Sequence, residues 1–181
     1  GKFNEIINGI PDWVNEEEFE FNTALTFNAD GTMLCWLKYD EKNVGQYSLQ
    51  LYKGSHPAHD DYSVYPGVYS YKYPKAGQDN SKMSAWSYDI KSHRTQKLQV
   101  PLDADGYMPR IVPTPNADKV LVYTMPRHQD VLNLYAANPR STVAHLLLKE
   151  SVAKYVKEET MVNLKIGDNY ILVPSDRDGY N

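Results

Sequence analysis

NADGTMLCWLKY, residues 28–39, carries the pattern that decides the fold of this chain. A polar turn at 28–31 comes first, and apolar and aromatic residues dominate the run that follows, at 32–39. A short apolar run between turn residues predicts a β-strand whose two faces are both packed. Polar residues at 40–43 predict the next turn.

The same order of turn, strand and turn returns twice along the chain. PTPNAD at 113–118 precedes the run KVLVYTM at 119–125, and a weaker copy, LKIGDN at 164–169, precedes YILV at 170–173. Asp118 and Asp168 are 50 positions apart, close to the length of a four-stranded propeller blade, roughly 40 to 50 residues. The repeat therefore predicts blades of a β-propeller.

The first copy of the repeat contains an insertion. Asp30 and Asp118, at matching positions of the first two copies, are 88 positions apart. Tyr88 and Tyr135, a second pair of matching positions, are only 47 apart. The first copy therefore has about 41 extra residues between Asp30 and Tyr88. They fall at about 41–81, where QYSLQLYK at 46–53 and VYSYKY at 68–73 alternate like two paired strands. An isolated ribbon of two strands is at best marginally stable in water. This arm is therefore expected to cover its own blade or to contact another molecule.

The predicted fold is all-β, a partial β-propeller of about two to three four-stranded antiparallel blades with a short acidic helix and a β-arm insertion. The expected segments are listed in chain order: an acidic segment at 1–22, a blade at 23–107 with its insertion, a second blade at 108–150 and the start of the next at 151–181. A closed propeller needs about four to eight blades. We therefore expect a piece of a larger propeller, and open sheet edges should make the isolated piece associate with itself.

An acidic segment, NGIPDWVNEEEFEF at 8–21, precedes the first repeat. Asp12 is a good N-cap, and acidic residues suit the positive end of a helix dipole, so we expect a short helix that begins near Trp13. Successive helical residues differ by about 100° around the axis, so Glu17 and Glu18 can present neighbouring carboxylates to one spot. A primary ammonium, with three donors, would relieve the repulsion between them. The alternative interpretation is a solvated acidic face.

The acidic segment resembles the substrate-binding segment of the dipeptidyl peptidase IV family of serine exopeptidases, where an aspartate-tryptophan-valine step precedes a double glutamate. The matching residues are GIPDWVNEEEF at 9–19, and YPKAG at 73–77 matches a second motif of the family. Asn15 departs from the pattern, because family members often carry an aromatic residue there. The family's double glutamate holds the free α-ammonium of a peptide, which implies this role for Glu17 and Glu18.

The resemblance runs over essentially the whole chain and implies a function. The chain would be the middle part of the N-terminal propeller of an enzyme that releases Xaa-Pro or Xaa-Ala dipeptides from peptides with a free N-terminus. The catalytic serine, histidine and aspartate would belong to an α/β-hydrolase domain that is absent here, since the chain has no G-x-S-x-G motif. The chain alone should be inactive. The family also implies a homodimer through the arm at 41–81 and a periplasmic or secreted location.

Composition and spacing argue against several other kinds of site. A net charge of −4 does not suit a nucleic-acid interface, which needs clustered Lys and Arg. The lone Cys35 lies in an apolar alternation and is expected to be a buried hydrophobic residue rather than a nucleophile. HPAHDD at 56–61 has metal-ligating side chains, but Pro57 opposes the helix that H-E-x-x-H zinc motifs need. We therefore expect no metal and no cofactor.

Two other functions stay open at this point. The first is a noncatalytic propeller that binds partner proteins through its tyrosine-rich insertion. The second, and weaker, uses the carboxylates as the acid and base of a glycosidase, although adjacent helical glutamates are poorly disposed to flank a glycosidic bond. A hydrolase segment encoded after residue 181 would separate the peptidase from the noncatalytic propeller.

Overall fold

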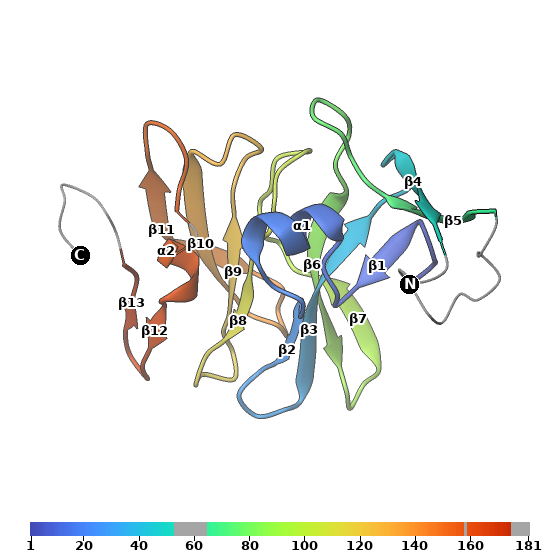
Figure 1. Cartoon of the computed structure of the whole chain (residues 1–181). Helices are drawn as coiled ribbons and strands as arrows, with labels where there is room; N and C mark the ends of the chain where they lie inside the picture. Colours follow the sequence, from blue (N-terminus) through green and yellow to red (C-terminus); the bar gives the residue numbers. More distant parts are fainter. Residues whose placement is uncertain (53–64, 158, 175–181) are drawn as a thin grey trace.

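The structure, a computed structural model, describes residues 1–52, 65–157 and 159–174 of the chain (Figure 1). Antiparallel strands dominate these ranges, which confirms the predicted all-β class. No helix in them has the length and hydropathy that a membrane span requires.

The first repeat folds into a five-stranded antiparallel sheet. Its strands are β1 (Ile6–Asn8), β2 (Leu25–Phe27), β3 (Met33–Asp40), β6 (Lys82–Asp89) and β7 (Arg94–Lys97). The path runs β1-β3-β6-β7, and β2 pairs beside β1 on the same edge of β3. β1 pairs with β3 around Tyr39, and β2 pairs with β3 around Cys35. The long strand β3 therefore pairs with two short strands along one edge.

Burial along β3 alternates from residue to residue. Met33, Cys35, Leu37 and Tyr39 are fully buried, and the residues between them are half-buried. The expectation that both faces are packed is therefore met only in part, because successive side chains point to opposite faces and one face is only partly covered. Cys35 is buried as predicted, and burial raises the pKa of its thiol to about 12.

The second repeat folds into a four-stranded antiparallel sheet. Its strands are β8 (Ile111–Pro113), β9 (Val120–Thr124), β10 (Val131–Ala137) and β11 (Ala144–Ser151), in the spatial order β11-β10-β9-β8. All five residues of β9 are buried, so this strand lies at the centre of the hydrophobic core. Beyond this sheet come a one-turn helix, α2 (Glu159–Val162), and the small hairpin of β12 (Lys165–Ile166) and β13 (Ile171–Leu172).

The two large sheets stand side by side, with β2 in contact with β8, and share one core (Figure 1). One apolar cluster joins β3 to β9, for example through Leu37 and Val122. A second cluster joins β9 and β10 to the α2 and β12–β13 region. The repeated turns also meet, because the Asn28 side-chain amide donates to the carbonyl of Ala117 over 2.9 Å.

The insertion forms a ribbon of two strands, β4 (Gln46–Leu51) and β5 (Gly67–Lys72), which pair with each other in antiparallel register. This pairing confirms the predicted hairpin to within two residues at each inner end. Tyr47 and Tyr71 are directly opposite, with ring centroids 6.3 Å apart. In Figure 1 the ribbon lies to one side of the sheets, near the N-terminus, and forms a separate two-stranded sheet.

Candidate functional site

The acidic segment forms a short helix, α1 (Trp13–Phe19), which begins where the sequence predicts. The Asp12 carboxylate caps it by accepting hydrogen bonds from the Asn15 backbone N–H (2.9 Å) and side-chain amide (2.7 Å). The helix ends at Glu20, whose backbone is left-handed (φ 47°, ψ 48°). Isolated helices of fewer than about 12 residues are marginal in water, so packing must hold α1 in place.

Aromatic contacts fix α1 at both ends. The ring of Phe19, which is 2% exposed, meets the ring of Tyr107 edge-on at 5.3 Å between centroids. At the other end, the Trp13 ring lies 4.1 Å from that of Tyr73, just after β5. α1 therefore lies between the second sheet and the ribbon, across the front of the strands in Figure 1. A helix fixed in this way presents its outward side chains at defined positions.

Glu17 and Glu18 are exposed neighbours on α1. Within the described residues, neither carboxylate makes a hydrogen bond or an ion pair. The pKa of the Tyr107 phenol is raised, mainly because the side chain is buried. The negative charge of nearby Glu18 raises it further. Asn80 donates to the Tyr107 hydroxyl over 2.8 Å and opposes this effect. The ammonium-anchor role of the two glutamates stays a prediction.

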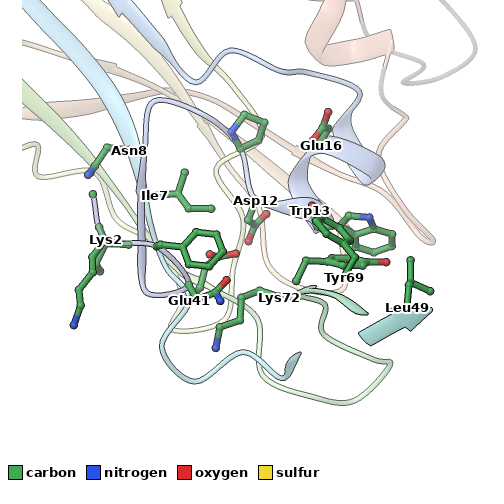
Figure 2. A pocket seen from close by; sticks show the side chains of 16 residues that line it. Lys2, Ile7, Asn8, Asp12, Trp13, Glu16, Glu41, Leu49, Tyr69 and Lys72 are labelled. Atoms are coloured by element: carbon green, nitrogen blue, oxygen red, sulfur yellow. The ribbon is translucent and has the colours of Figure 1, made fainter. Parts of the chain in front are cut away.

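A cavity of about 650 Å³ lies beside α1. Its lining includes Asp12 and Glu16, then Glu41 just after β3, and Tyr69 and Lys72 from β5 (Figure 2). The other two members of the glutamate run, at 17 and 18, do not line it. Of the three consecutive glutamates, the first therefore lines the cavity and the other two lie outside it.

Glu41 is a residue that sequence reasoning missed. The predicted turn at 40–43 suggested a solvated side chain, whereas Glu41 is only 5% exposed. Burial and, to a smaller extent, the charge of Asp12 raise the pKa of its carboxyl to about 7, against the opposing charge of Lys72. The letters DEKN around it are those of an ordinary polar turn, so no local signal marks this residue.

Arg110 and Arg127, which stand near strand ends in the sequence, both have contacts within the fold. The Arg110 guanidinium lies 4.7 Å from the centre of the Phe21 ring and donates to the carbonyl of Pro109 over 2.8 Å. Arg127 donates to the carbonyl of Gln78 over 2.7 Å. These contacts suit a structural role for both side chains.

Three features of the sequence lie outside the described residues: the HPAHDD motif at 56–61, most of the connection between the two predicted strands of the arm, and the last residues, 175–181, of the segment predicted to start the next blade. Among the residues that the structure describes, no group of three or more His, Cys, Asp or Glu side chains is placed to hold a metal ion.

Comparison with known proteins identifies the family. The family model described as "Dipeptidyl peptidase IV (DPP IV) N-terminal region" matches residues 1–181. The dipeptidyl aminopeptidase B of Saccharomyces cerevisiae is 30% identical over 160 residues, which cover 81% of this chain and 18% of that protein. The dipeptidyl-aminopeptidase B of Aspergillus niger is 31% identical over 159 residues, 82% of this chain and 17% of that protein. The chain thus spans less than a fifth of these relatives.

A solved structure confirms the fold. The crystal structure of Porphyromonas gingivalis dipeptidyl peptidase 4 superposes with a TM-score of 0.89 at 36% identity, over 99% of this chain and 24% of that one. The match supports the predicted partial β-propeller. With the family model over the whole chain and a fold match of this quality, the chain belongs to the dipeptidyl peptidase IV family, as part of its N-terminal region.

Proposed function

We propose that this chain is the part of a dipeptidyl peptidase that holds the free N-terminus of the peptide substrate, through Glu17 and Glu18. The names of its relatives support a peptidase that removes dipeptides. The observation that carries the proposal is a pair of exposed, consecutive carboxylates without partners among the described residues, on a helix fixed at both ends. Such a pair suits a ligand that brings both positive charge and several hydrogen-bond donors.

The proposed chemistry is positioning. The α-ammonium of the substrate donates to the two carboxylates, and its charge offsets their mutual repulsion. With the amine end held, the peptide bond two residues along is the one presented to a nucleophile. That nucleophile, a serine activated by histidine and aspartate, would come from an α/β-hydrolase domain outside this chain. A substrate with a blocked N-terminus would leave the carboxylates uncompensated and should be a poor one.

The test is the double variant Glu17→Gln/Glu18→Gln in the intact peptidase. Loss of two charge-assisted contacts should lower kcat/KM for a free-amine dipeptide substrate by roughly 100-fold or more. Glu20→Gln, a matched change of an exposed glutamate just after α1, should leave kcat/KM within about twofold. Unchanged cleavage by the double variant would show that the anchor lies elsewhere.

A second proposal concerns the ribbon, which would contact a second copy of the protein in a homodimer. Large apolar side chains are exposed on both faces of the ribbon: Leu49 (40%) and Tyr69 (55%) on one face, and Val68 (66%) on the other. Exposed apolar patches on soluble proteins often mark interaction surfaces. These exposed side chains also suit the noncatalytic alternative, a propeller that binds another protein through its ribbon.

A further inference from the structure

The cavity beside α1 contains two buried acidic side chains. Asp12 and Glu41 are each 5% exposed, and Figure 2 draws them close together in its wall. Asp12 already accepts two hydrogen bonds from Asn15, whereas the Glu41 carboxylate makes no hydrogen bond or ion pair within the described residues. A carboxylate that is removed from water and left without a donor is costly. Glu41 therefore needs a proton or a positively charged partner.

The cation that acts on Glu41 within the fold, Lys72, is engaged elsewhere. Its ammonium donates to the carbonyl of Val44 over 2.8 Å, and its charge lowers the pKa of Glu41 without forming an ion pair. The other lysine of the cavity wall, Lys2, is paired with Glu5 at 2.5 Å. The negative charge of the wall is therefore only partly offset by its own lysines.

The rest of the wall suits an organic cation more than a bare metal ion. The aromatic side chains of Trp13 and Tyr69 line the cavity, and Figure 2 shows them beside one another, with Leu49 next to them. Aromatic faces attract ammonium groups and bury alkyl chains. Glu16, which is exposed, adds a further carboxylate to the wall. A volume of about 650 Å³ lies in the range of small-molecule pockets.

We propose that this cavity binds a primary ammonium group on an alkyl chain, with Glu41 and Asp12 facing the charge and Trp13 and Tyr69 enclosing the chain. The occupant is a lysine side chain of a bound peptide or a free aliphatic diamine, because both carry the same group. This site is separate from the proposed substrate anchor, whose two glutamates do not line the cavity.

The probes lack the free α-amine that the proposed substrate anchor would hold. N-acetyl-lysine-N-methylamide has a blocked α-amine, so its side-chain ammonium is its only charge, and the norleucine analogue has the same chain without charge. We expect the lysine probe to shift the Trp13 indole N–H signal in NMR titrations of the 181-residue chain, and the norleucine probe to shift it at least about tenfold more weakly. Equal shifts with the two probes, or none with the lysine probe, would overturn the proposal.

Two variants of the cavity should act in opposite directions. Glu41→Gln should weaken binding of the lysine probe about tenfold by removing the buried charge, and Lys72→Met should strengthen it about fivefold by removing a like charge. A change in the same direction for both variants would indicate general damage to the fold and contradict the proposal. Asp105→Asn, an exposed loop carboxylate of equal charge, is the matched control.

Further measurements identify the occupant and separate the two proposals. Tighter binding of cadaverine than of the lysine probe would identify a free diamine, and the reverse order would identify a basic peptide side chain. The double variant Glu17→Gln/Glu18→Gln should bind the lysine probe within about twofold of the original chain, since these side chains are outside the cavity. A large loss of probe binding in that variant would refute a separate site, whatever its effect on peptidase activity.

Discussion

At the scale of single residues, Glu41 links the charge of the cavity to the stability of the fold. The ordinary pKa of a glutamate carboxyl is 4.5, and in the folded chain burial raises it to about 7. The folded state therefore holds the proton more tightly than the unfolded state. The stability that this residue contributes is fully present below the unfolded value and is lost as the pH rises through about 7.

Glu41→Gln should remove this pH dependence. Between about pH 4 and about pH 8 the free energy of unfolding of the unchanged chain should fall, relative to that of the variant, by up to about 3 kcal/mol, since one pKa unit corresponds to about 1.4 kcal/mol. Urea denaturation of the 181-residue chain at several pH values measures the difference. Glu20→Gln, an exposed glutamate, is the control and should keep the slope. If the free energy of unfolding of Glu41→Gln fell with rising pH as steeply as that of the unchanged chain, the raised pKa of Glu41 would be contradicted.

The contrast between Glu17 and Glu41 shows what single residues reveal in a sequence. Glu17 stands in a dense acidic run after a cap, and its exposure follows from that local pattern. Glu41 also stands among polar residues, but its burial depends on β1 and on the ribbon, because Ile7 and Lys72 line the same cavity. Neighbours that come from more than 30 positions away leave no local signal.

At the scale of elements, local chemistry predicted where structure begins better than where it ends. The Asp12 cap located the start of α1, since a side-chain acceptor for the first N–H groups is a local feature. The end of α1 at Glu20 has no glycine to mark it. The β7 strand is another example: its bounds, Arg94–Lys97, are set by pairing with β6 and not by a local feature of the sequence.

The ribbon allows a prediction about assembly. Val68 is 66% exposed, and neighbouring strand residues point to opposite faces, so it faces away from the cavity that Tyr69 lines. If the ribbon forms the proposed homodimer, Val68→Asp in the intact protein should raise the dimer dissociation constant at least about tenfold, because a charge would be buried at the interface. Light scattering with size-exclusion chromatography measures this. Thr95→Asp, on exposed β7, should have no effect, and a dimer that survives Val68→Asp would place the interface elsewhere.

At the scale of the whole molecule, the sequence predicted the repeat but not the contact between its first two copies. The turns of the first two copies share the sequence Asn-Ala-Asp, which identified them as equivalent. In the structure they are joined by the hydrogen bond between Asn28 and Ala117. The spacing also located the insertion, because a blade has a nearly constant length. The partner of each turn could not be predicted, since it depends on how the two sheets lie side by side.

Arg140 is part of the contact between the two repeats. It follows β10, yet its guanidinium donates to the Asp30 carboxylate and the Thr32 hydroxyl in the first repeat, each over 2.7 Å, and lies 3.6 Å from Asp118 in the second. Surface ion pairs are individually weak, but one arginine here joins two sheets. Arg140→Ala should lower the Tm of the chain by roughly 2 °C at low salt, and by less at high salt because the charges are then screened. Arg94→Ala, at an exposed arginine on β7, should leave the Tm unchanged at both salt concentrations. If Arg140→Ala lowered the Tm equally at low and high salt, the arginine would stabilise the chain by packing of its alkyl chain and not by its charge.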